Sequence, residues 1–215
     1  MTLPSPAVSR RTPVQSRSQQ TVQRILDAAG TLLTRTPLED VTTTRIAAEA
    51  SLSIGALYRF FPDKQSIIDA VAVHHVQQFR ALVESTVMPP LLDRLDDLAT
   101  FDPADILNRM IDAYILYLDA HPDFRTISFG RHISTATRQR ETSPTVGLPA
   151  MLTNFIVEHL GLSLTPDLEL MVSVVSQAGE RLVAFAYEQP TREERDRVIA
   201  EVKKILSGYL FGSTG

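Results

Sequence analysis

Apolar residues recur at helical spacing from Val22 almost to the C-terminal end, and no segment shows the sustained alternation of a strand. Residues 1–20 show no apolar period and are rich in Ser, Pro, Gln and Arg, which predicts a flexible arm. Pro37 follows the first apolar stripe, where it cannot continue a helix. That stripe runs over three turns and consists of Val22, Ile25, Leu26, Ala29, Leu32 and Leu33.

Residues 41–64 predict two short helices joined by a tight turn. Thr42 is a favourable N-cap for the first helix, and Val41 and Ile46 have the spacing of a hydrophobic staple. The turn is Ser51-Leu52-Ser53, whose last serine is a favourable N-cap for the second helix.

The second of these short helices is too small and too polar for a core element. Gly55 permits close approach of the backbone, Tyr58 carries a hydroxyl that reaches a phosphate, and Arg59 supplies a cation. A helix that enters the major groove of DNA needs these features. The remaining apolar side chains, Leu57, Phe60 and Phe61, are expected to anchor the helix against Leu26, Ala29 and Ile46.

A longer helical body follows. An amphipathic helix is predicted from Ser66 to about Val87, with Met88-Pro89-Pro90 as its end. N-cap and proline patterns predict helix starts at Asp102, Thr165 and Thr191. The chain is therefore predicted to be all-α, with about nine helices.

Composition narrows the class of protein. The 215 residues are 44% hydrophobic and 21% charged, enough to bury a core of one large or two small domains. Cysteine is absent, which excludes disulfides and thiolate metal sites. No apolar run reaches the roughly 18 residues of a membrane span, and the N-terminus lacks the apolar core of a signal peptide. We therefore expect a cytoplasmic protein with no membrane partner.

The charge is unevenly distributed along the chain. The net charge is −4, but residues 1–64 contain 8 basic and 5 acidic residues, a net of +3, which leaves −7 for the remainder. A basic head on an acidic body can orient toward a polyanion. Many proteins that bind no nucleic acid have a similar bias. The charge distribution alone therefore does not decide whether this protein binds nucleic acid.

The pattern T-x-x-I-A-x-x-A-x-x-S-x-G-x-L-Y-x-x-F-x-x-K, from Thr43 to Lys64, closely resembles the DNA-binding head of TetR-type transcriptional regulators. The resemblance covers roughly residues 20–70. It implies a helix-turn-helix domain over 21–65 and a ligand-binding and dimerisation domain over 66–215. It also implies a homodimer that binds a palindromic operator, and a small-molecule effector that releases it, as in a repressor.

The resemblance also implies specific DNA contacts. Matched residue by residue, Thr43, Tyr58 and Lys64 contact phosphates, whereas Ser53, Ile54, Ala56 and Arg59 face base edges. The full expected set is Thr43, Thr44, Arg45, Ser53, Ile54, Gly55, Ala56, Tyr58, Arg59 and Lys64. Three positions depart from the family pattern: Ser51-Leu52 replaces Gly-Val, Phe60 replaces His, and Thr36-Pro37 replaces a Gly-aromatic pair.

Two questions about the head stay open. Arg59 either pairs bidentately with guanine or only contacts phosphate. The arginines of the arm, Arg10, Arg11 and Arg17, either enter a flanking minor groove or belong to a solvated tail.

The body contains candidates for an effector pocket. Aromatic and Met side chains with a few polar tips suit an apolar cavity with sparse orienting groups, and they equally suit an ordinary core. The candidates are Met110, Tyr114, Tyr117, Phe124, Phe129, His132, Phe155, His159, Met171 and Gln177.

The last two helices have the pattern of a dimer interface. Apolar residues occupy their core stripes and also off-stripe positions such as Val174 and Val183. A helix with two apolar faces needs two partners, its own core and another subunit. Small residues on the first of these helices, Ser173, Ser176, Ala178 and Gly179, permit close helix approach. The resemblance implies a four-helix bundle across a two-fold axis.

Other functional classes receive little support. The chain lacks Glu-x-x-His, His-Glu-x-x-His, Gly-x-Ser-x-Gly and a phosphate loop, so no enzyme activity and no cofactor are predicted. The five histidines have no metal-ligand spacing in the sequence, and no metal is predicted. A helical binding or scaffold protein without DNA function remains the alternative.

Overall fold

The computed structural model describes residues 13–89, 102, 104–130, 132–141, 149–159 and 163–212, and every regular element in these ranges is a helix. The all-α class predicted from the sequence is confirmed. The chain divides into two compact units, Met1–Ile67 and Ile68–Gly215. The division falls within α4 (Lys64–Leu82), close to the domain boundary expected after residue 65.

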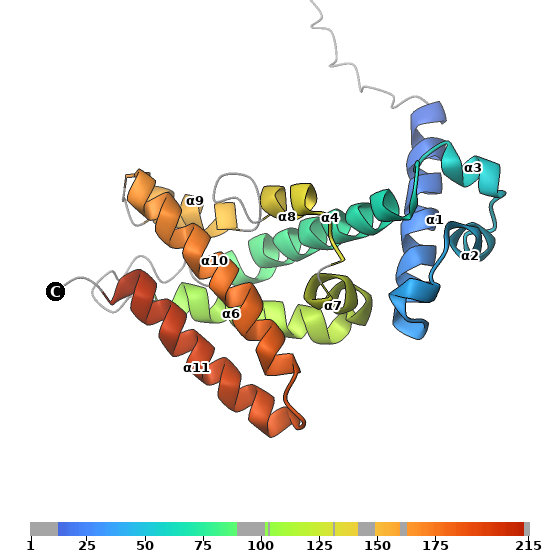
Figure 1. Cartoon of the computed structure of the whole chain (residues 1–215). Helices are drawn as coiled ribbons and strands as arrows, with labels where there is room; N and C mark the ends of the chain where they lie inside the picture. The colour runs from blue at the N-terminus through green and yellow to red at the C-terminus, as the bar shows by residue number, and fades with distance from the viewer. Residues whose placement is uncertain are drawn as a thin grey trace, which may run out of the picture. The chain divides into compact units, whose positions relative to one another are not determined.

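The first unit contains α1 (Pro13–Arg35), the short 3-10 turn η1 (Leu38–Asp40), α2 (Thr43–Glu49) and α3 (Ile54–Tyr58) (Figure 1). Both predicted caps form: the Thr42 hydroxyl accepts from Arg45 N at 3.2 Å, and the Ser53 hydroxyl accepts from Ala56 N at 3.2 Å. The core of this unit is built from the predicted apolar stripes. Its fully buried side chains are Ile25, Ala29, Val41, Ile46, Leu57 and Ile67.

The prediction of a flexible arm over residues 1–20 is wrong for residues 13–20, because α1 begins at Pro13. Residues 17–20 are exposed, so nothing selects for an apolar period there and a periodicity search cannot detect the helix. Proline is compatible with a first helical position, and the following Gln and Arg residues are good helix formers. Residues 1–12, with Arg10 and Arg11, lie outside the described residues.

The turn between α2 and α3 depends on a residue in the left-handed region. Ser51 has a φ of 53°, in a position where the Cβ of an L-residue is crowded. Arg24 of α1 donates to the carbonyls of Ala50 at 2.5 Å and of Ser51 at 3.3 Å. This guanidinium satisfies acceptors at the end of α2 and so holds the turn that positions α3.

Replacing Ser51 with glycine is expected to raise the free energy of unfolding by about 1 kcal/mol, because glycine adopts positive φ without the steric cost that serine incurs. Urea denaturation followed by circular dichroism measures the change. Ser51→Ala is the matched control, since alanine keeps the crowded Cβ and should give no gain. Equal stabilisation by both variants would contradict the assignment of strain to Ser51.

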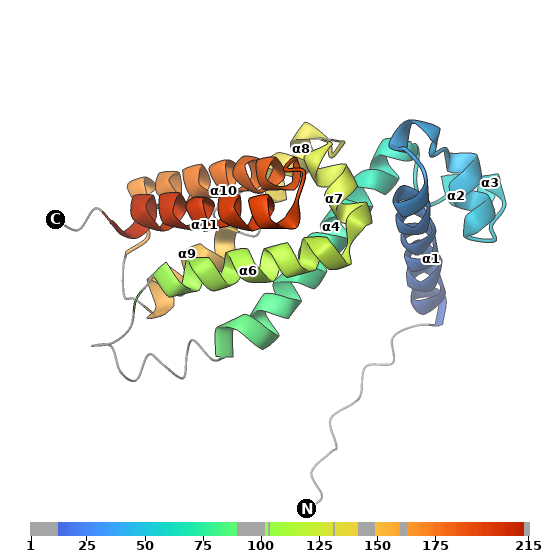
Figure 2. The ribbon, with the colours of Figure 1, turned by 90° about the horizontal axis from the view of Figure 1, so that it is seen from below.

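The second unit contains most of α4, which continues through a π-helical turn, η2 (Val83–Val87), and is helical to Pro89. The Asp63 carboxylate caps α4 by accepting from Ser66 N at 2.7 Å. Six further helices follow within the described ranges (Figures 1 and 2). They are α6 (Ala104–Ala120), α7 (Pro122–Phe129), α8 (Thr135–Glu141), α9 (Pro149–His159), α10 (Pro166–Tyr187) and α11 (Arg192–Phe211).

Helices α10 and α11 lie side by side over most of their length (Figure 2). The predicted N-caps Thr165 and Thr191 accept from the amides of Leu168 and Glu194, each at 3.2 Å. Gly179 lets the pair approach closely, since a Cβ at this position would lie 3.3 Å from Leu206 Cδ1. Among the described helices, none combines the length and apolar character needed to cross a membrane.

Candidate DNA-binding surface and effector cavity

The outer surface of α3 exposes two large side chains on a helix of five residues. Ile54 is 40% exposed and Tyr58 is 50% exposed, although Leu57 on the opposite side is fully buried. A Cβ added to Gly55 would meet no atom within 4 Å, so no packing within the chain requires glycine here. The surface is therefore open to close approach by a partner.

Tyr58 is connected to the start of α2. Its hydroxyl lies 3.1 Å from the Thr43 hydroxyl, and both side chains are accessible to solvent. This hydrogen bond brings two predicted phosphate contacts from different helices to one place on the surface. The backbone amides at the start of α2 add partial positive charge close to it.

Two predicted DNA-binding cations have partners inside this unit. The Arg45 guanidinium donates to the Asp40 carbonyl at 2.8 Å and to the Thr36 hydroxyl at 3.3 Å. The Lys64 ammonium donates to the Leu38 carbonyl at 3.0 Å. Both side chains thus hold the connection between α1 and α2, a role that the sequence pattern did not reveal. Arg59, the residue after α3, is exposed.

The second unit contains a cavity of about 190 Å³ among its helices, and this cavity is partly open to the surface. Most of its lining side chains are apolar and belong to α4, α6, α9 and α10. The lining residues are Ala72, Val76, Phe79, Leu107, Met110, Ile111, Tyr114, Phe124, Ser128, Ile133, Thr137, Arg138, Pro149, Leu152, Val175, Ser176, Gly179, Glu180, Val183 and Leu206.

A few polar groups face this apolar lining. Arg138 and Glu180 form an ion pair, and Thr137 donates to the Asp69 carboxylate at 3.0 Å. Burial, with a smaller contribution from Glu180, raises the pKa of Tyr114 well above its usual value, so its hydroxyl stays neutral. The buried Ser128 hydroxyl has no hydrogen-bond partner among the described protein atoms. Such sparse polar groups in an apolar cavity can orient a small ligand.

The cavity includes three of the predicted pocket residues, Met110, Tyr114 and Phe124. Five others do not line it: Tyr117, Phe129, His132, Met171 and Gln177. Phe129 packs against Tyr187 with the two rings tilted by 50° and their centroids 5.4 Å apart, and His132 is exposed rather than buried. The side chains of Phe155 and His159 lie outside the described part of the chain. Helical periodicity placed these residues in the body, but it could not say which of them face a cavity and which face a neighbouring helix.

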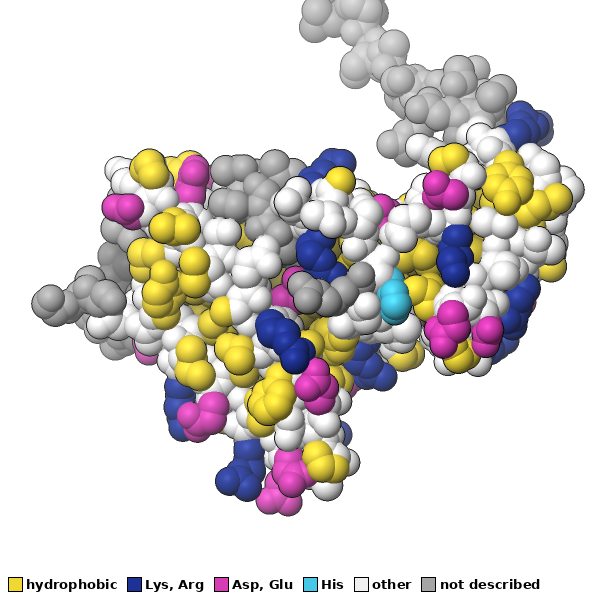
Figure 3. Space-filling model, viewed as in Figure 1, with side chains coloured by type: hydrophobic (Ala, Val, Ile, Leu, Met, Phe, Trp, Pro, Cys, Tyr) yellow, Lys and Arg dark blue, Asp and Glu magenta, His cyan; other side chains and the backbone are white. Residues whose placement is uncertain are grey.

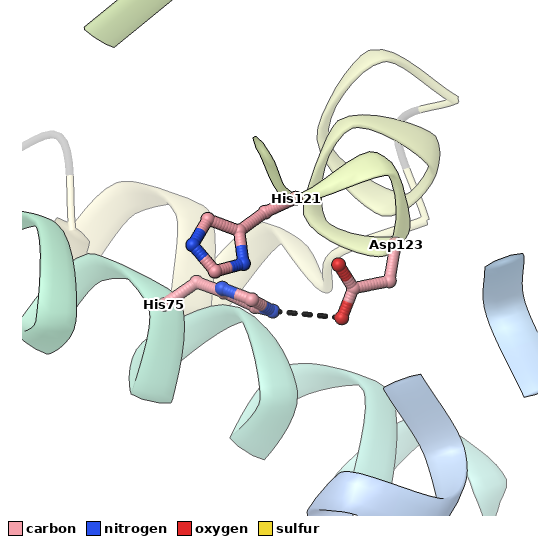
Figure 4. Close-up of side chains that lie close together, drawn as sticks. All are labelled: His75, His121 and Asp123. Atoms are coloured by element: carbon pink, nitrogen blue, oxygen red, sulfur yellow. Dashed lines mark hydrogen bonds and ion pairs between the residues drawn. The ribbon is translucent and has the colours of Figure 1, made fainter. Parts of the chain in front are cut away.

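A second cluster of polar side chains lies where α4 meets the junction of α6 and α7 (Figure 4). His75, only 6% exposed, has its Nδ1 2.8 Å from the Tyr117 hydroxyl and its Nε2 2.9 Å from Asp123 Oδ2. His121 lies beside them, with its ring centroid 5.1 Å from that of His75 and 4.1 Å from that of Tyr117.

The cluster shifts the pKa values of its members. Burial and the neighbouring His75 lower the pKa of His121, which favours its neutral imidazole. Burial alone would raise the pKa of Asp123, but the hydrogen bond and charge of His75 outweigh it and lower that pKa. Burial, aided by Asp123, raises the pKa of Tyr117, whose hydroxyl therefore remains protonated. Sequence spacing missed this cluster because His75 lies on α4 and Tyr117 on α6, far in sequence from Asp123 at the start of α7.

An apolar surface extends over α10 and α11 (Figure 3). Leu170 is 63% exposed and Ile205 is 55% exposed, although each helix also buries a complete stripe against the core. The large exposed apolar residues of these two helices are Leu170, Val174, Phe185, Ile205 and Tyr209, and we call them the α10–α11 face. Several large apolar side chains exposed on two neighbouring helices are typical of an interaction surface.

Comparison with known proteins covers both units. Residues 25–71 match the family model described as bacterial regulatory proteins, tetR family, and residues 102–213 match that of the tetracyclin repressor-like C-terminal domain. No curated protein matches the chain. Three solved structures share the fold at low sequence identity.

A TetR-family transcriptional regulator from Streptomyces coelicolor is 24% identical, with 88% of this chain and 97% of that chain covered and a TM-score of 0.64. A TetR transcriptional regulator from Rhodococcus sp. RHA1 is 16% identical, with 92% and 100% covered and a TM-score of 0.64. RolR in complex with resorcinol is 15% identical, with 92% and 96% covered and a TM-score of 0.62. Since the match to the C-terminal domain alone spans more than half of the sequence, the chain belongs to the TetR family of transcriptional regulators.

Proposed function

We propose that the protein is a transcriptional repressor that binds a palindromic operator as a homodimer and is released by a small molecule. Members of its family are DNA-binding regulators and not enzymes. The open outer surface of α3, where Gly55 is flanked by the exposed Ile54 and Tyr58, is the observation that carries the DNA-binding part. A helix presented in this way fits the major groove.

Within this surface the residues have separate roles. Of the paired hydroxyls of Thr43 and Tyr58, one donates to the other, and the remaining O–H would donate to a phosphate of the DNA backbone and fix the register of the head. Arg59 supplies the cation that reads a base edge or strengthens phosphate contact. Arg45 and Lys64 support the head through their bonds to the connection between α1 and α2, in addition to any contact with phosphate.

The effector would occupy the cavity of the second unit. A volume of about 190 Å³ with mainly apolar walls suits a small, largely apolar molecule with one or two hydrogen-bonding groups. RolR, which has the same fold, was solved with resorcinol, a small aromatic diol. Helix α4 lines the cavity and begins in the DNA-binding unit. A shift of α4 on effector binding would therefore couple the cavity to the DNA-binding surface.

Release by an effector requires a coupling free energy between the two sites, typically about 1–3 kcal/mol, which corresponds to roughly 5–150-fold in affinity. Fluorescence anisotropy with labelled operator DNA measures this coupling. Operator affinity should fall within that range at a saturating concentration of the true effector. Calorimetry establishes whether a ligand occupies the cavity. If such a ligand leaves operator affinity unchanged, the release mechanism is contradicted.

Gly55→Ala is expected to separate DNA binding from stability. The added methyl meets no atom of the protein and improves helix propensity, so the free energy of unfolding should stay the same or rise by up to about 1 kcal/mol. The same methyl would hold the backbone away from DNA and lower operator affinity by tenfold or more. Thermal denaturation and anisotropy on the same preparation test both parts. Unchanged affinity would mean that this surface does not approach DNA closely.

A further inference from the structure

The cluster of His75, His121 and Asp123 combines two imidazoles and one carboxylate from separate parts of the second unit. One ligand-type atom from each residue lies within 4.8 Å of the other two. His75 comes from α4, His121 is the N-cap residue of α7, and Asp123 lies in its first turn (Figure 4). Nothing in the proposed repressor mechanism uses this arrangement.

The hydrogen bonds around His75 determine which of its nitrogens is available. The Gln78 amide nitrogen lies 3.0 Å from the His74 ring, so its oxygen is the end that accepts the Tyr117 hydroxyl at 3.0 Å. Tyr117 then has only its oxygen lone pairs to offer, and His75 Nδ1–H donates to it at 2.8 Å. A metal-binding histidine is held in the same way, with one ring N–H bound to a neighbouring group.

This network leaves His75 Nε2 facing Asp123 Oδ2 at 2.9 Å. At this distance the two atoms share a proton in a hydrogen bond, and a metal ion that displaced this proton would be bound by the same nitrogen and oxygen. His121 supplies a third ligand beside this pair. It caps α7 without a side-chain hydrogen bond to the helix, so its ring is not held by a capping role.

We propose that His75, His121 and Asp123 bind a divalent transition-metal ion of the zinc class. Imidazole and carboxylate donors suit zinc and its neighbours rather than magnesium, and three protein ligands leave a position for water or an exogenous ligand. Metal–ligand bonds of about 2.0–2.1 Å place tetrahedral ligands roughly 3.3 Å apart. Reaching this spacing requires a slight opening of the His75–Asp123 pair and an inward rotation of the His121 ring.

The surroundings of the site are compatible with this role. His75 is buried, whereas His121 and Asp123 are partly exposed, so an ion can enter from solvent. Because the ligands come from α4 and from the start of α7, a bound ion would fix these two segments of the second unit to each other. The site itself does not depend on DNA binding.

Titration of the untagged, chelator-treated full-length protein with Co²⁺ tests the proposal, followed by Zn²⁺ in competition with a chromogenic chelator. We expect one ion per chain, with cobalt absorption bands of a four- or five-coordinate site, and no competition from Mg²⁺. His121→Ala and Asp123→Asn should each weaken Zn²⁺ binding at least tenfold. Asp123→Asn keeps the size of the side chain and an oxygen that accepts from His75, so its fold is preserved.

His132→Ala is the matched control, since His132 is an exposed histidine outside the cluster, and it should bind Zn²⁺ as the unaltered protein does. Zn²⁺ should also raise the melting temperature of the unaltered protein and of His132→Ala but not of the two ligand variants. Absence of stoichiometric binding, or full binding by His121→Ala and Asp123→Asn, would overturn the proposal. Neither result would bear on operator binding, which is measured separately.

Discussion

Leu170→Asp and Ile205→Asp are each expected to convert the protein to a monomer and to abolish specific operator binding. Both side chains belong to the α10–α11 face and are more than half exposed within the chain, at 63% and 55%, so their replacement removes little from the core. A charge buried without a partner costs about 3–5 kcal/mol, and a two-fold interface contains each substitution twice. The two charges together cost about 6–10 kcal/mol, so the dimer dissociation constant should rise by at least about 10⁴-fold.

Analytical ultracentrifugation measures the association state, and circular dichroism verifies that the helices persist. Leu116→Asp is the matched control, because Leu116 is a leucine on α6 with 69% exposure that lies outside the α10–α11 face. This control should remain dimeric. Dimerisation of both α10–α11 variants at the strength of the unaltered protein would place the interface elsewhere.

Arg59→Ala is expected to lower operator affinity by about 1–3 kcal/mol, or roughly 5–150-fold, because the variant loses a bidentate contact with a base or a charge near phosphate. Arg59 is exposed beyond the last residue of α3, so the melting temperature should change little. Anisotropy with operator DNA measures the change in specific affinity, and anisotropy with unrelated DNA of equal length measures the change in non-specific affinity.

Arg59→Lys distinguishes the two roles of this side chain. Lysine keeps the charge but lacks the planar fork, so it retains phosphate contact and loses bidentate pairing with guanine. If Arg59 reads a base, the lysine variant should lose specificity nearly as fully as Arg59→Ala. If it contacts only phosphate, the lysine variant should bind almost normally. Unaltered affinity in both variants would exclude Arg59 from the interface.

Local signals in the sequence were sufficient for much of the fold. Caps act within one turn, so Thr42, Ser53, Thr165 and Thr191 could each be identified from neighbouring residues, and each forms the expected bond. The apolar stripe that contains Ile25 likewise became the core of the first unit. The start of α1 was missed because its exposed first turns contain no apolar period.

The candidate sites were less accessible to sequence reasoning, because they depend on contacts between distant segments. Arg24 reaches the end of α2 across 26 positions, and His75 reaches Asp123 across 48. No spacing rule connects such residues. The same limit explains why Tyr117 was assigned to a ligand pocket, since its aromatic character is visible in the sequence but its bond to His75 is not. The residues predicted to contact DNA depend less on such contacts, because one short segment contains all of them.

The central claim, that α3 presents a sequence-specific DNA-binding surface, is tested most directly by a salt series. Binding is measured between 50 and 200 mM salt (roughly the range over which phosphate contacts weaken) to the DNA flanking the protein's own gene and to unrelated DNA of equal length. We expect tight binding to the flanking fragment, at least about 10³-fold stronger than to the control, with affinity falling steeply as salt rises. Absence of binding to either fragment at low salt would contradict it and would favour a helical scaffold without DNA function.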